Sequence, residues 1–138
     1  EKKLLWMAGA RGKLTRRAVA GEPTEVALAE GANELFGTMP ADLQRRFADV
    51  PRVLERLEVQ ARRLRGSSAD PGGERLASTL AAMESVRLDL LRLKAGAGTP
   101  DDLTADLESA RKVGERIEGL LDALREVEAG LRTPTPVT

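Results

Sequence analysis

The sequence predicts an all-α fold, an antiparallel helical bundle or coiled-coil hairpin of three long helices with a shorter helix ahead of them. Three observations support this prediction. Apolar residues recur at gaps of three and four along most of the chain, which is the spacing of a helix buried on one face. No segment alternates apolar and polar residues as a half-buried strand does. The breaks between periodic segments are short and rich in Gly and Pro, and short connections force neighbouring helices to run antiparallel.

The expected short helix begins at Thr24, within an acidic stretch over residues 21–42 that holds five acids and no base. Gly31 lies in the middle of this helix, where glycine is ~1 kcal/mol less favourable than alanine. We interpret Gly31 as allowing the close approach of another backbone. We expect the apolar face to pack into the core rather than to line a ligand pocket. That face holds Leu28, Ala32, Leu35, Phe36 and Met39.

Residues 43–65 carry an unbroken heptad seam, the pattern of helices that pack in pairs. The seam consists of Leu43, Phe47, Val50, Leu54, Leu57, Ala61 and Leu64. Pro51 lies inside it, and a proline within a helix removes one hydrogen bond and clashes with the preceding turn. Because the seam keeps its phase through Pro51, the sequence favours one kinked helix over a fresh helix capped by Asp49. The acidic helix and this heptad helix together form the unit 21–65.

Residues 66–73, with the sequence GSSADPGG, are predicted to be a flexible linker. An antiparallel helical hairpin is expected over residues 74–131. Its first helix packs through Leu76, Leu80, Met83, Val86, Leu90 and Leu93. Thr99 caps the second helix, with Pro100 at the first helical position. The second helix packs through Leu103, Leu107, Ala110, Gly114, Ile117, Leu121, Leu124 and Leu131, with Val113, Leu120 and Val127 alongside. Residues 132–138 are predicted to be a disordered tail.

The composition excludes most kinds of chemistry. The 138-residue chain has no Cys, so it holds no disulfide and no thiolate metal site. It has no His, which removes the usual general base and the commonest metal ligand. Its three aromatic side chains are too few for a nucleic-acid module that stacks bases. The longest apolar run, Leu4 to Ala8, is far shorter than the ~20 residues that span a bilayer. We therefore expect no enzyme, no cofactor, no metal site and no nucleic-acid partner.

Some segments imitate ligand sites without meeting their requirements. In AGARGKLTRR and the residue before it, Met7 stands where a P-loop needs its first Gly, and Leu14 stands where a Ser or Thr must bind Mg²⁺. The acids Asp101, Asp102 and Asp106 could suggest a cation site, but helix capping explains the first two better. A row of arginines is long enough to touch a phosphate backbone, yet interleaved acids favour a solvated helix face. This row is Arg45, Arg46, Arg52, Arg56, Arg62, Arg63 and Arg65.

Residues 1–20 hold six basic side chains against one acid, so the sign of the charge alternates along a chain whose net charge is zero. Oppositely charged neighbouring segments attract, although exposed ion pairs contribute only ~0–1 kcal/mol each. We expect this basic segment to be a linker or a contact surface. It could lie on an anionic membrane with Trp6 at the headgroups, or pack on another domain, which we favour. The contact residues would be Lys2, Lys3, Trp6, Arg11, Lys13, Arg16 and Arg17.

The helical part of the chain contains the motifs PTEVAL, LF followed by MP, DVPRVLERLE and RLDLLRL. With them, residues 23–128 resemble the C-terminal helical tail of certain bacterial serine/threonine protein kinases, which follows the catalytic domain. The resemblance implies a kinase domain in the same parent chain, which transfers phosphate from ATP. The kinase His-Arg-Asp loop needs a His that this chain lacks, and Leu35-Phe36-Gly37 lacks the metal-binding Asp of Asp-Phe-Gly. The segment itself is therefore expected to be non-catalytic.

The leading hypothesis is a cytoplasmic, helical interaction or regulatory region that mediates self-association, as a homo-oligomer, or docking on a protein partner. The alternative is a peripheral membrane or complex-anchoring subunit that uses the basic N-terminal segment. The chain starts mid-pattern without a Met, so we expect it to be a piece of a longer protein. The packing seam on which the leading hypothesis depends is Leu54, Leu57, Leu64, Leu80, Met83, Leu90, Ile117, Leu121 and Leu124.

Overall fold

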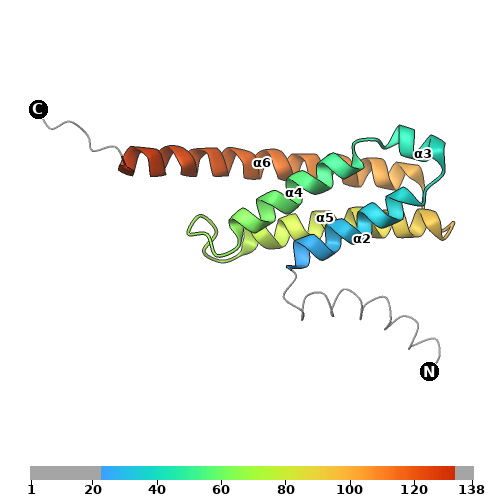
Figure 1. Cartoon of the computed structure of the whole chain (residues 1–138), viewed down its shortest axis with the longest axis horizontal. Coiled ribbons are helices and arrows are strands. Elements are labelled where there is room, and N and C mark those ends of the chain that lie inside the picture. The colour runs from blue at the N-terminus through green and yellow to red at the C-terminus, as the bar shows by residue number, and fades with distance from the viewer. Residues whose placement is uncertain (1–22, 133–138) are drawn as a thin grey trace, which may run out of the picture.

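The structure is a computed structural model that describes residues 23–132 (Figure 1). These residues contain helices and no strand, so the all-α prediction is confirmed. The five helices are α2 (Thr24–Gly37), α3 (Ala41–Arg46), α4 (Val50–Leu64), α5 (Glu74–Lys94) and α6 (Pro100–Arg132). The expected basic segment and the last six residues of the expected tail lie outside the described part of the chain.

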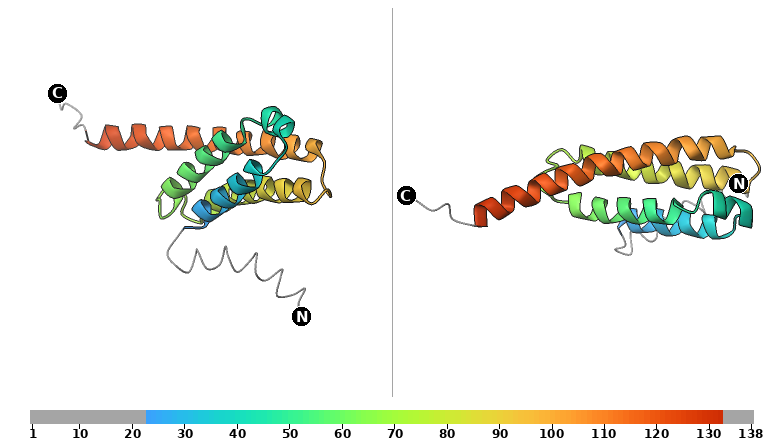
Figure 2. Two further views of the ribbon diagram at one scale, coloured as in Figure 1. Left: turned by 45° about the vertical axis from the view of Figure 1, so that its right-hand side comes forward. Right: turned by 90° about the horizontal axis from the view of Figure 1, so that it is seen from above.

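Four of the helices pack side by side as a bundle, and α3 is a short connecting helix. α2 and α5 run in one direction, and α4 and α6 run in the opposite direction (Figure 1). α4 and α5 contact each other, and each of them also contacts both α2 and α6. α2 and α6 therefore lie on opposite sides of the α4–α5 pair, as the view from above also shows (Figure 2). The finer prediction of three long helices in a coiled-coil hairpin is not confirmed.

The prediction of one kinked helix through Pro51 is wrong. α3 ends at Arg46, and a new helix begins at Val50 with Pro51 in its first turn. A proline fits there because the first-turn amides have no partner within the helix. Asp49 occupies the cap position but its side chain makes no capping hydrogen bond. It accepts a hydrogen bond from Arg111 Nη2 of α6 instead, at 2.9 Å.

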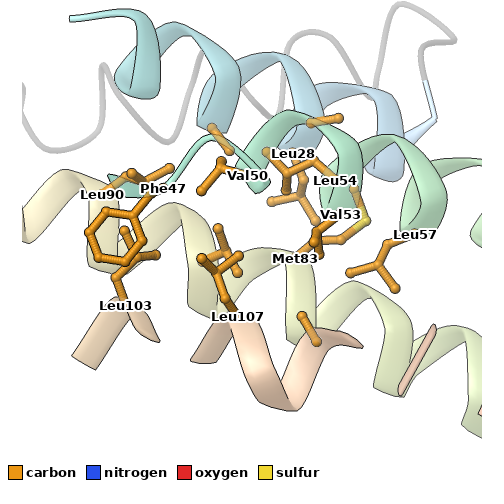
Figure 3. Close-up of a cluster of buried hydrophobic side chains, with 14 of the residues drawn as sticks. Leu28, Phe47, Val50, Val53, Leu54, Leu57, Met83, Leu90, Leu103 and Leu107 are labelled. Carbon is orange, nitrogen blue, oxygen red and sulfur yellow. The ribbon is translucent and has the colours of Figure 1, made fainter. Parts of the chain in front are cut away.

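The core is a continuous apolar cluster to which all four bundle helices and the α3–α4 turn contribute. Phe47, from that turn, inserts beside Leu90 of α5 and Leu103 of α6 (Figure 3). A smaller cluster of Leu64, Ile117 and Leu121 closes the opposite end, where α4 finishes. Burying each of these large side chains stabilises the fold by ~1.5–3 kcal/mol, so packing is the main force that holds the bundle together.

Two polar side chains satisfy backbone groups at helix ends. Gln44 Nε2 donates to three carbonyls at the C-terminus of α2, those of Phe36, Gly37 and Met39. Asp70 accepts hydrogen bonds from the first amides of α5, at 2.9 and 3.0 Å. Burial alone would raise the pKa of Asp70, but these backbone hydrogen bonds outweigh it and lower the pKa. The predicted linker 66–73 is therefore anchored to the start of α5.

Gly31 does not mark a close approach of two backbones, contrary to the expectation from the sequence. A Cβ added at Gly31 would meet the Arg87 Cδ atom of α5 at 3.6 Å, which is an ordinary van der Waals distance to a flexible side chain. Gly96 differs, because its φ of +74° is a left-handed conformation that other residues rarely adopt. The two glycines should therefore respond oppositely to the same substitution.

We expect Gly31→Ala to stabilise the protein by about 0.5–1 kcal/mol, because alanine restricts the unfolded chain and suits the helix interior better. Gly96→Ala should destabilise it by about 1–2 kcal/mol, because alanine resists the left-handed conformation. Urea unfolding followed by circular dichroism gives both values from the midpoints. A lower midpoint for Gly31→Ala would show that α2 and α5 lie closer together than described.

Candidate interaction site

α6 is longer than the helices that cover it. It has 33 residues, against 15 in α4 and 21 in α5. At 1.5 Å per residue, α6 is about 50 Å long and α4 about 22 Å. The C-terminal part of α6, coloured red, projects beyond the ends of α4 and α5 in every view (Figures 1 and 2). Within the described part of the chain, the side chains of this projecting end are exposed from residue 125 to residue 131.

An apolar row continues along the projecting end. The row is Val113, Ile117, Leu120, Leu124, Val127 and Leu131, with successive gaps of 4, 3, 4, 3 and 4. Its first members lie in or against the smaller core cluster. Leu120 and Leu124 are half-buried, Val127 is 59 % exposed and Leu131 is 81 % exposed. We call Leu120, Leu124, Val127 and Leu131 the α6 stripe. Such spacing is typical of a helix that packs against another helix.

An open cleft rich in arginine lies beside the α6 stripe, where α4 ends. It measures about 390 Å³ and is lined by Arg63, Arg65, Gly66, Ser67, Ser68, Leu121, Leu124, Arg125 and Glu128. We call it the arginine cleft. Arg65 binds Glu25, and Arg125 lies 3.5 Å from Asp122. Arg63 and Glu128 form no salt bridge within residues 23–132. The cleft therefore offers a cation on its α4 side and an anion on its α6 side.

A buried ion pair fixes the start of α2 against the end of α4. The Glu25 side chain is fully buried, and its Oε1 accepts a hydrogen bond from Arg65 Nη2 at 2.5 Å. Glu25 Oε2 has no hydrogen-bond partner among the described residues. Arg65 is 46 % exposed, so water screens part of the attraction. The geometry is that of a structural contact, and it holds one wall of the arginine cleft in place.

A second buried acid lies between α5 and α6. Asp89 is 3 % exposed, and its Oδ2 has no hydrogen-bond donor among the described residues. Burial raises the pKa of Asp89 to about 7, and the carboxyl group of Asp106, helped by Asp102, acts in the same direction against the opposing charge of Arg92. With this raised pKa, Asp89 is expected to hold a proton below about pH 7, and that proton would be the donor that the two facing carboxyl groups lack. Within residues 23–132, no group of three acids is placed to hold a metal ion.

Most of the predicted seam packs inside the chain. Seven members are buried within the bundle, namely Leu54, Leu57, Leu64, Met83, Leu90, Ile117 and Leu121. Leu80 and Leu124 are half-buried. Leu124 alone of these nine belongs to the α6 stripe, so the seam joins the core to the projecting end. The predicted contacts from Lys2 to Arg17 lie outside the described residues.

The other candidate groups have structural roles. The Thr99 Oγ1 atom accepts a hydrogen bond from the Asp102 amide at 3.2 Å, so capping is confirmed at the start of α6. Four members of the arginine row lie in ion pairs, namely Arg46, Arg56, Arg62 and Arg65. These charges serve mainly to connect helices of the same chain.

Glu25 and Asp89 were missed from the sequence, although a signal for each was present. Glu25 precedes Leu28 by three residues and Ala32 by seven, so it shares the apolar face of α2. Asp89 follows Val86 by three residues on the buried face of α5. An acid on an apolar helix face points to a partner buried with it, and that partner cannot be identified from one helix alone.

Comparison of the chain with known protein families, with curated proteins and with solved structures finds no match. The similarity to kinase tails therefore remains a prediction from the sequence. Among the helices of residues 23–132, none is both long enough and apolar enough to cross a membrane.

Asp89 makes the stability of the bundle depend on pH near neutrality. Its pKa is about 7 in the folded state and near the ordinary 3.8 when unfolded. Between these values the folded state binds more protons, so the free energy of unfolding should fall by up to about 1.4 kcal/mol per pH unit as the pH rises. The stabilisation is complete below the unfolded pKa and is lost as the pH rises through the folded pKa. Urea unfolding from about pH 5 to about pH 8 measures it.

Asp89→Asn should flatten this pH profile and be more stable than the wild type at the alkaline end, because an amide cannot ionise. The exposed substitution Glu108→Gln should leave the slope unchanged. The chain has no His, so no imidazole adds to the titration in this range. A wild-type stability that stays level or rises across the range would contradict the shared proton.

Proposed function

We propose that this chain is a non-catalytic helical interaction region that uses the α6 stripe and the adjoining arginine cleft to bind a protein partner. The exposure of the stripe supports the proposal. Val127 and Leu131 continue the heptad spacing of the core, yet they are 59 % and 81 % exposed. Exposing these aliphatic side chains to water is unfavourable, and burying one of them against a partner would contribute ~1.5–3 kcal/mol to the free energy of binding.

The projecting end is also a helix that gains from a neighbour. Isolated helices shorter than ~12–15 residues are marginal in water, because forming the first turn is unfavourable. The end of α6 is supported on its N-terminal side by the bundle, and its apolar face is presented in a fixed direction. A partner helix therefore finds its binding surface already formed, and little ordering entropy opposes the contact.

The buried acids support a structural role rather than catalysis. Glu25 is engaged with Arg65, and Asp89 lies against Asp106 between two helices. Neither lies on the wall of the arginine cleft, the open site next to the stripe. The charged groups that do line this cleft are arginines and one glutamate, which suit recognition of a charged surface.

The proposal extends to the parent chain, which we infer to be a cytoplasmic bacterial serine/threonine protein kinase. The resemblance of the motifs PTEVAL, DVPRVLERLE and RLDLLRL to kinase tails is the ground for this inference, and an interaction region would then assemble or position the kinase domain. The coding sequence upstream of Glu1 tests it. A catalytic domain with its His-Arg-Asp and Asp-Phe-Gly motifs is expected there, and an unrelated domain would end the kinase assignment while leaving the interaction role open.

Replacing Leu124, Val127 and Leu131 together by Glu should abolish partner binding without unfolding the bundle, because these side chains lie mostly outside the core. Gel filtration of extracts from the producing cells tests this. The wild-type chain should elute well above its 14.9 kDa mass, and the variant should elute as a monomer with an unchanged circular dichroism spectrum.

A matched variant with Glu108, Glu115 and Glu126 replaced by Gln changes three exposed α6 side chains outside the stripe and the arginine cleft, and should behave as the wild type. Monomeric elution of the wild type, both in extracts and after purification at high concentration, would contradict the proposed function.

A further inference from the structure

We propose that the partner of the α6 stripe is a second copy of this chain, whose own α6 stripe packs against it in the antiparallel direction. This inference rests on the proposed function and names its partner. The register of the stripe and the charges on its two flanks lead to the inference independently of each other.

The stripe is self-complementary when two copies run antiparallel. If Leu124 lies opposite Val127 of the second copy, then Leu120 lies opposite Leu131 of that copy. The reciprocal pairs follow by symmetry, so four apolar layers form without a gap or a polar residue. Each layer combines a half-buried residue near the bundle with an exposed residue near the end of the helix. Leu131, the most exposed side chain of the stripe, is thus covered by Leu120 of the second copy, which is itself half-buried against its own bundle.

The flanks of the stripe select the antiparallel direction. The flank toward the arginine cleft carries Leu121 and Glu128, and the other flank carries Arg116, Ala123 and Gly130. Two helices packed face to face bring like flanks together when antiparallel and unlike flanks together when parallel. A parallel pair would therefore turn a flank without an acid toward the arginine cleft.

In the antiparallel pair, Glu128 of the second copy comes alongside Leu121, which lines the arginine cleft. Arg63 lines the same cleft and has no salt bridge within residues 23–132. The structure thus supplies a cation on one copy and an acid on the other at the same place. The contact occurs twice because the pair is symmetric.

Four layers make a short interface, which belongs with weak and transient contacts rather than with permanent dimers. Association of the isolated chain should therefore depend on concentration. In a longer parent protein, any second contact between copies would raise the effective concentration of the stripes and strengthen the pairing without new contacts here.

Cysteine cross-linking tests the direction, because the natural chain has no Cys. Leu124→Cys and Val127→Cys should form a mixed disulfide rapidly when the two variants are combined under mild oxidation. Each variant alone should cross-link more slowly. A Val127→Cys variant that couples to itself as fast as to Leu124→Cys would show a parallel or unordered pair, and would overturn the antiparallel proposal.

Charge exchange tests the flank contact. Arg63→Glu and Glu128→Arg should each weaken the dimer by about tenfold, because each creates two like-charge contacts per dimer. Mixing the two variants should restore wild-type association, because the mixed dimer has only opposite charges at both contacts. Sedimentation equilibrium from about 10 µM to about 1 mM measures all three. If the mixture associates as weakly as each variant alone, the contact between Arg63 and Glu128 of two copies is overturned. An ion pair between Arg63 and Glu128 of the same chain would not be restored by mixing.

The results separate this inference from the proposed function. If the purified chain stays monomeric over the whole range but the wild type still elutes as a large, stripe-dependent assembly in extracts, then the partner is a different protein. The interaction role would stand and the second copy would be excluded. If neither assembly is seen, both proposals fail.

Discussion

The buried face of α4 is the contact on which the rest of the bundle depends. Val50, Leu54 and Leu57 are fully buried, and α4 contacts α2, α5 and α6. α4 ends at Leu64, and the chain then turns away through Gly66, whose φ is +74°. Because α6 is more than twice as long as α4, its C-terminal part is left without this neighbour. The exposed stripe is therefore a consequence of where α4 stops.

Polar side chains fix the relative positions of the helices that the apolar core holds together. The Gln60 Nε2 atom of α4 donates to the Gly114 carbonyl of α6 at 2.9 Å, deep in the interface. Glu25 and Arg65 join α2 to the end of α4, and Asp89 faces α6 from α5. Apolar contacts alone allow helices to slide, whereas each of these polar contacts forms at one relative position of its two helices only. The arginine cleft is lined by residues at the end of α4 and on α6, so its position beside the stripe depends on these fixed helix positions.

Local signals explain which parts of the fold could be predicted. Thr24 and Pro100 begin helices as expected, because starting residues act through their own neighbours in the sequence. The break before Val50 was missed because the intervening turn of three residues preserves the phase of the apolar seam. Gln44 caps α2 across a turn, and Asp89 meets Asp106 across two helices. Which residues meet in this way depends on how the helices pack against one another. The spacing of residues within one helix carries no information about that packing.

The pattern of α6 is the main support for the proposed partner of its projecting end. Leu121 packs in one cluster with Leu64 of α4, and seven residues later the same side of α6 carries Glu128, whereas the stripe continues through Val127 and Leu131. A helix end without a neighbour has no need of such a row and could be polar all round. The proposed second neighbour would give the continued apolar row a surface to pack against.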